Sequence, residues 1–360
     1  MINIIKAWYQ RHFSDPQVII LALLLLLFAL VFIIMGGVLA PVIAAVVISY
    51  VLEGAVGKMQ RLGLPRMLAV VTVFVLFLFA ILLLTLGMMP LIVNQLVQLF
   101  KELPNMIGAG QQLLMELPQK YPIISEQQIS DLMSLINSEI ASLGQHILSL
   151  SLSSVVDVFT LLVYMVVVPL LVFFFLQDKD NIVTWLKQFL PNDMGLASKV
   201  WHDVDIKIGN YVRGKILEIF IVGFATYLPL ALMGMDYAAL LSVLVGLSVI
   251  IPFVGAVAVS IPVVLIAFFQ WGFTTDFMTL IIAYSVVQFL DGNLLVPLLF
   301  SEVVNIHPAA IIIAVLVFGG LWGVWGVFFA IPLATLVQAV INAWPVIEDT
   351  EKPVEQSTQG

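Results

Sequence analysis

Residues 18–35 form an unbroken run of eighteen apolar side chains that ends at the pair Gly36-Gly37. A helix needs about 20 such residues to cross the hydrocarbon core of a bilayer. A secretory signal would have a shorter apolar stretch and a small-residue cleavage site, so we expect a retained span. Only 10% of the residues are charged, against about 25% in soluble domains, so lipid is the expected solvent of the chain.

Further apolar segments follow, and together they predict an all-α integral membrane protein with about eight transmembrane segments. They are residues 18–35, 36–52, 67–89, 155–176, 216–235, 237–269, 277–300 and 308–340. Two of them, 237–269 and 308–340, have 33 residues each. A helix of that length would extend about 50 Å, against a hydrocarbon core of about 30 Å. Each of these two segments must therefore tilt strongly, break or turn back as a re-entrant hairpin.

The lysines and arginines predict the orientation. If the N-terminus is inside and the segments alternate, twelve of the fourteen basic residues face the cytoplasm. Only Lys101 and Lys120 then lie outside. Because cytoplasmic loops carry an excess of Lys and Arg, we expect a multi-pass membrane protein with both termini in the cytoplasm.

The expected parts of the chain follow from these segments. They are an N-terminal three-helix membrane part (1–90), a periplasmic helical insert (91–151), a fourth transmembrane helix (152–177), a cytoplasmic interfacial helix (178–213), a C-terminal membrane part with an internal repeat (214–345) and a disordered acidic tail (346–360). Within the insert, a capping box at Ser125 opens a helix whose apolar residues alternate in steps of four and three from Ile129 to Leu150. This seam packs either on the chain's own residues 94–103 or on a neighbouring subunit.

The two long segments resemble one another. Residues 238–262 and 309–332 both open with Ala-Ala, align Gly255 with Gly326, and end with Ile-Pro after one deletion. Secondary transporters build their sites from such paired, Gly/Pro-interrupted segments, although tight helix packing is the alternative explanation. The predicted breaks and hinges are Pro252, Gly255, Pro262, Pro297, Pro308, Gly323, Gly326 and Pro332.

A carboxylate lies inside the seventh segment. Tyr284, Gln288 and Asp291 share one helical stripe, and Asn293 and Pro297 follow directly. Carboxylate and amide oxygens gathered in a membrane suit a small cation or a proton. We expect Asp291 to exchange a proton for a cation during transport. The alternative is that the helix ends here and Asp291 lies in an outer loop.

A second acidic residue, Glu218, lies near the cytoplasmic end of the fifth segment. Lys215 is three residues earlier, and Arg213 is close. Glu218 therefore makes either a local ion pair or part of an ion pathway. The predicted pathway residues are Asp291, Asn293, Gln288, Tyr284, Glu218 and Arg213.

Other functional classes lack their sequence signatures. The chain has no cysteine, no phosphate-binding Gly-x-x-x-x-Gly-Lys-Ser/Thr motif and no His-Glu-x-x-His, and its four histidines are dispersed. Basic clusters are too sparse for nucleic acid. We therefore expect no enzymatic activity, no cofactor and no metal site.

Four stretches together resemble the AI-2E family of bacterial inner-membrane permeases. They read YVRGKILEIFIVGF (211–224), IIPFVGAVAVSIP (250–262), DGNLLVPLLFSEVVNIHP (291–308) and GVWGVFFAIPLA (323–334). The stretch LLFSEVVNIHP is most similar to the PerM-type subgroup. The family often has Glu where this chain has Asp291, and Gly-Lys where it has Ser301-Glu302.

The resemblance implies a secondary permease. Some members of the family are similar to exporters of the signal autoinducer-2, and others to Na⁺(Li⁺)/H⁺ antiporters. It also implies a homo-oligomer, with a pentamer as one candidate. We expect export of a small solute by cation- or proton-coupled or facilitated transport, with membrane lipid and a small-molecule or cation substrate as partners. The alternatives are a Na⁺(Li⁺)/H⁺ antiporter and a non-transporting scaffold that binds a periplasmic partner.

Overall fold

The computed structural model describes residues 16–120, 163–189, 195–252, 254–300 and 306–343, together with residues 127 and 134. These residues form helices and short turns with no strand among them, which confirms the all-α class. The predicted seam from Ile129 to Leu150 and the predicted tail 346–360 lie outside the described residues. The chain divides into two compact units. The first comprises the described residues of Met1–Leu39, Asp180–Tyr211 and Phe300–Gly360, and the second those of Ala40–Lys179 and Val212–Leu299.

The first two apolar segments are continuous in the structure. Helix α2 runs from Pro16 to Arg61 as one helix of 46 residues, through Gly36-Gly37 and Pro41. Two separate spans with a turn at the glycine pair, as the sequence suggested, are therefore not what forms. The residues around the glycines are apolar and helix-compatible, and a single proline removes only one backbone hydrogen bond. The predicted cytoplasmic location of the N-terminus was derived by counting residues 18–52 as two spans, and it remains a prediction.

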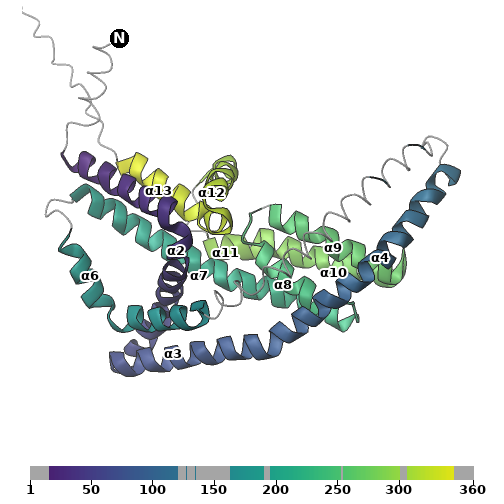
Figure 1. Cartoon of the computed structure of the whole chain (residues 1–360), viewed down its shortest axis with the longest axis horizontal. Helices are drawn as coiled ribbons and strands as arrows, with labels where there is room; N and C mark the ends of the chain where they lie inside the picture. Colours follow the sequence, from purple (N-terminus) through teal and green to yellow (C-terminus); the bar gives the residue numbers. More distant parts are fainter. Residues whose placement is uncertain are drawn as a thin grey trace, which may run out of the picture. The chain divides into compact units, whose positions relative to one another are not determined.

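A long helical rod follows in the second unit, where Figure 1 shows α3 leading into α4 with a bend between them. It consists of α3 (Arg66–Leu83), the π-helical turn η1 (Leu84–Met88) and α4 (Met89–Lys120). The start of the rod packs with the end of α2 and with the helix Val163–Gln177. The core they share contains Ala45, Val56, Ala69, Val70, Val73, Val172 and Leu176.

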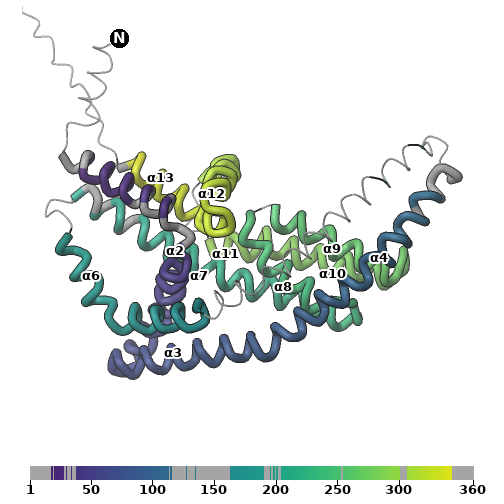
Figure 2. Tube along the Cα trace, in the orientation of Figure 1, coloured from purple at the N-terminus to yellow at the C-terminus, as the bar shows by residue number. Residues whose placement is uncertain are grey.

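The sixth apolar segment is broken into a helical hairpin. Its arms are α8 (Ala238–Ser248) and α9 (Val254–Trp271), which pack on one another and on α10 (Thr275–Leu290), as the trace in Figure 2 shows. A Cβ on Gly255 would overlap the carbonyl oxygen of Ser248 on the other arm, so only glycine fits the crossing. Pro252 lies in the turn, as predicted, and Pro262 lies within α9.

Helix α4 supports this hairpin from outside. Its Gln95 Oε1 accepts a hydrogen bond from Leu240 N in the first turn of α8, at 2.8 Å, and Leu99 and Met106 pack on the hairpin core. This is the stretch 94–103 that we considered as a partner for the seam. Part of its surface is thus used within the second unit by α8.

The eighth apolar segment repeats the hairpin in the first unit. Helix α12 (Pro308–Phe328) begins with His307 as its N-cap and Pro308 in its first turn, and it leaves helical geometry at Gly323, where φ is 59° and ψ is −135°. A Cβ on Gly326 would overlap the carbonyl oxygen of Phe318. Helix α13 (Ala330–Ala343), which contains Pro332, packs against α12. The predicted alignment of Gly255 with Gly326 therefore pairs two residues in the same structural role.

Two further helices precede these. Helix α6 spans Lys179–Lys187, and α7 runs unbroken from Gly195 to Leu232, so the predicted boundary at 213/214 falls inside α7. Six helices of the described chain are long and apolar enough to cross a membrane. They are Val38–Arg61, Arg66–Gln112, Val204–Leu232, Val254–Trp271, Thr275–Phe300 and Pro308–Phe328. Shorter apolar helices are Val163–Gln177, Ala238–Ser248 and Ala330–Asn342.

Candidate transport site

A buried ion pair lies on α7. Lys215 and Glu218 are 5% and 2% exposed, and Lys215 Nζ lies 2.6 Å from Glu218 Oε2. The predicted local ion pair is thus present, but it is buried among apolar side chains. Removing two charges from water costs several kcal/mol per ion, so a buried pair is poor evidence of a purely stabilising role.

Lys215 also holds the break of the first hairpin. Its Nζ donates to the carbonyl oxygen of Val249 at 3.0 Å. Val249 is the residue at which α8 ends, and Pro252, three residues later, has no N–H to offer. One ammonium group therefore serves both a carboxylate and the end of a broken helix.

Asp291 begins a π-helical turn, η2 (Asp291–Leu295), which continues into α11 (Val296–Phe300). The amide of Val296 donates to the carbonyl of Asp291, five residues back. In a regular α-helix Pro297 would donate to the carbonyl of Asn293, and its missing N–H favours the wider turn. The alternative that Asp291 lies in an outer loop is wrong, because helix continues on both sides of it.

The acidic groups of α7 and η2 share one cation. Asp291 is attracted by Lys215 and repels Glu218 electrostatically. Asp291 Oδ1 is buried and accepts no hydrogen bond from any residue that the structure describes. Two carboxylates beside one ammonium leave an excess negative charge, which favours a proton or a cation at this position. We call Lys215, Glu218 and Asp291 the charged centre.

A polar row leads from the charged centre along α10. The Tyr284 hydroxyl lies 2.9 Å from Ser260 Oγ of α9, and Ser260 itself donates to the carbonyl of Ala256. The side chain of Gln288, one turn before Asp291, lies beside the Tyr284 hydroxyl, and its Nε2 is buried. The predicted stripe Tyr284–Gln288–Asp291 therefore faces the interior of the second unit in part.

Two predicted pathway residues lie elsewhere. Asn293 is exposed, and its Nδ2 donates to the carbonyl of Phe289 in its own helix, at 2.9 Å. Arg213 is exposed and lies against α2, with its guanidinium carbon 5.3 Å from the Tyr50 ring centre and its side chain beside Gly54. No described interaction joins either residue to the charged centre.

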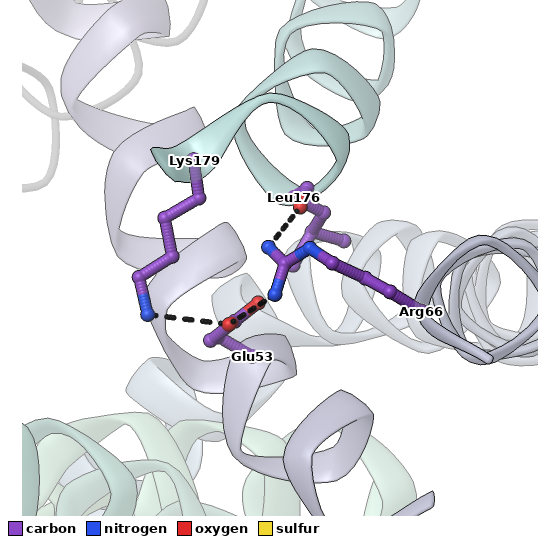
Figure 3. Close-up of polar contacts among 4 residues, drawn as sticks. All are labelled: Glu53, Arg66, Leu176 and Lys179. Carbon is purple, nitrogen blue, oxygen red and sulfur yellow. Dashed lines mark hydrogen bonds and ion pairs between the residues drawn. The ribbon is translucent and has the colours of Figure 1, made fainter. Parts of the chain in front are cut away.

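A second polar cluster joins α2, α3, the helix Val163–Gln177 and α6, which begins at Lys179 (Figure 3). Glu53 Oε1 of α2 lies 3.3 Å from Arg66 Nη1 of α3 and 3.2 Å from Lys179 Nζ. Arg66 Nη2 also donates to the carbonyl of Leu176, near the end of the helix Val163–Gln177, at 2.8 Å. The cluster is partly exposed and ties these helix ends together.

Ser260 and Lys215 were missed as candidate site residues. Ser260 stands alone in an apolar stretch, and its only signal is its place two residues before Pro262. Lys215 was assigned only as a partner of Glu218. The hydrogen bond to Val249 O could not be foreseen, because a backbone carbonyl 34 residues later has no sequence signature.

Several long apolar helices, two of the apolar segments broken into hairpins, and a buried charged centre define a multi-pass membrane protein. Residues 20–346 match the sequence model of the family described as AI-2E family transporter, so the chain belongs to this family. Over 346 residues it is 44% identical to PerM of Escherichia coli (strain K12), named as a permease, covering 96% of this chain and 98% of that protein. It is 28% identical to YueF of Bacillus subtilis (strain 168), named as a transport protein, covering 81% and 80% of the two chains. The protein is thus a membrane transporter.

Proposed function

We propose that the protein is a secondary-active permease that exports a small polar solute, of the autoinducer-2 kind, across the inner membrane in exchange for protons or monovalent cations. The charged centre carries this proposal. A buried Asp291 oxygen without a hydrogen-bond donor, beside the pair Lys215–Glu218, offers a place where a proton or cation binds and leaves. The position of the centre at the break of the α8–α9 hairpin supports coupling between binding and helix movement.

A Na⁺(Li⁺)/H⁺ antiporter is the second candidate. One observation favours it: the centre has more carboxylates than cations, so a monovalent cation and a proton would compete for the same oxygens. In this case the ions are themselves the transported species, and no organic solute is needed.

The first prediction tests the charged centre. Asp291→Asn removes the negative charge at nearly constant volume, so it should abolish pH-gradient-driven flux while the protein still folds. Asp291→Glu should keep part of the activity, because it restores the charge. Flux of protons, Na⁺ and a small hydroxylated solute is measured in proteoliposomes.

Asp236→Asn is the matched control, since Asp236 is exposed in the turn before α8. Solute flux that collapses with the pH gradient supports the exporter, and Na⁺-driven proton flux without solute supports the antiporter. Flux in Asp291→Asn equal to that of the wild type would remove Asp291 from the mechanism. No flux of any probe in the wild type would favour the scaffold.

A further inference from the structure

Two residues of α7, one turn apart, each hold one of the two hairpins. Lys215 Nζ donates to the carbonyl of Val249 in the α8–α9 hairpin, within the second unit. The Tyr211 hydroxyl donates to the carbonyl of Phe328 in the α12–α13 hairpin at 3.4 Å, within the first unit. Each repeat is thus anchored to the same helix by a side-chain donor.

Both anchored carbonyls lie where a helix is interrupted. Val249 lies where α8 ends at the turn that contains Pro252. Phe328 lies four residues before Pro332, whose ring has no N–H. An unpaired carbonyl in a membrane protein is costly, so the donors from α7 stabilise the broken geometry of both hairpins.

The two donors differ in charge. Lys215 is an ammonium group whose position depends on Glu218 and, through space, on Asp291. Tyr211 is a neutral phenol, 1% exposed, whose ring packs on that of Phe300 at 5.6 Å between ring centres. Helices α12 and α13 contain no ionisable side chain, and neither do α8 and α9. Tyr284 of α10 is a further titratable group near the charged centre, and its hydroxyl makes a hydrogen bond with Ser260 Oγ.

We propose that Lys215 is a positioning residue that links the charge of the carboxylates to the first hairpin, while the second hairpin has a fixed anchor. When a proton or cation neutralises Glu218, Asp291 becomes the remaining counter-charge of Lys215, and movement of the ammonium group toward Asp291 releases the carbonyl of Val249, which loosens the α8–α9 break. The α12–α13 hairpin does not respond, because a phenol holds it. This inference rests on the proposed function and assigns the moving gate to one repeat.

Hydrogen/deuterium exchange of the full chain in detergent tests the asymmetry without requiring transport. Glu218→Gln mimics the neutralised carboxylate and should speed exchange about tenfold in peptides covering residues 246–252, the scale expected when one hydrogen bond to a charged group is lost. Exchange in residues 322–330 should stay as in the wild type. Tyr211→Phe should give the reverse pattern.

A second variant guards against misfolding. Lys215→Met alone leaves Glu218 buried without a partner, so Lys215→Met/Glu218→Gln removes both charges and should loosen only the first hairpin. Equal exchange at the two hairpins in every variant, or unchanged exchange at residues 246–252, would overturn the inference. The proposed function fails in a different experiment: it is contradicted when Asp291→Asn transports as fast as the wild type, whatever the exchange rates show.

Discussion

At Gly255 and Gly326 the fold has no room for a single methyl group. A Cβ on Gly255 would overlap the carbonyl oxygen of Ser248, and a Cβ on Gly326 would overlap the carbonyl oxygen of Phe318. Backbone cannot move aside as a flexible side chain can, so the arms of each hairpin would have to separate. The equivalence of these glycines makes the hairpin crossing, rather than the local bend, the reason for the repeat pattern.

The second prediction follows from this crossing. Gly255→Ala and Gly326→Ala should each lower the free energy of unfolding by about 1–3 kcal/mol, the usual cost of overpacking. Gly320→Ala is the matched control, because Gly320 is exposed in the same hairpin and a Cβ there meets nothing within 4 Å. Thermal unfolding in detergent provides the measurement. Equal melting temperatures for Gly326→Ala and Gly320→Ala would contradict the crossing.

Part of the candidate site could be predicted at the residue scale. The stripe Tyr284–Gln288–Asp291 followed from helical spacing, since residues three and four apart lie on one face. Arg213 was grouped with Glu218 because it is near in sequence, but five residues on a helix turn it through about 500°, onto a different face. Asn293 was expected to supply an oxygen ligand; its Nδ2 bonds its own helix, and the role of its oxygen stays a prediction.

At the scale of elements, the cluster in Figure 3 joins helix ends that are far apart in the sequence. Arg66 bridges Glu53 and the carbonyl of Leu176 with two arms of one guanidinium group. A lysine could not hold both acceptors in this fork geometry. Three of these helices, α2, α3 and Val163–Gln177, also share a continuous apolar core, so the cluster fixes how their ends meet.

The third prediction concerns this cluster. Arg66→Met should lower the free energy of unfolding by about 1 kcal/mol, because a charged hydrogen bond is lost from a partly exposed site where water screens the ion pair. Arg66→Lys should recover only part of the loss. The exposed Lys58, near the end of α2, gives the control Lys58→Met. A melting temperature for Arg66→Met that matches Lys58→Met would mean that the bridge adds nothing.

The breaks in the two long segments could be predicted from their length, because 33 apolar residues exceed the bilayer. The continuity of α2 could not, since a glycine pair is compatible with either a turn or a helix in apolar surroundings. The π-helical turn at Asp291 was also not foreseen in its form. Gly292 and Pro297 indicated that the helix is irregular here, but tertiary packing decides whether such a helix ends or widens into a π-helical turn.

At the scale of the whole molecule, one helix is longer than a membrane is thick. The apolar helix Arg66–Gln112 has 47 residues and therefore extends about 70 Å, more than twice the hydrocarbon core of about 30 Å. After Arg66, amide and charged side chains begin at Asn94 and recur at Gln95, Gln98, Lys101 and Glu102. The far part of the rod must therefore project beyond the membrane on the side opposite Arg66.

The last prediction fixes that side. Lys58, Arg61 and Arg66 gather at the near end of the rod, and the positive-inside rule places that end in the cytoplasm. Gln112 must then face the periplasm, whatever the number of crossings elsewhere. The chain has no cysteine, so single variants can be labelled cleanly. In intact cells an impermeant thiol reagent should label Gln112→Cys and leave Lys187→Cys unlabelled until the membrane is opened. The exposed position of both side chains makes the comparison matched. Labelling of Lys187→Cys but not Gln112→Cys from outside would invert the molecule, and with it the direction assigned to transport.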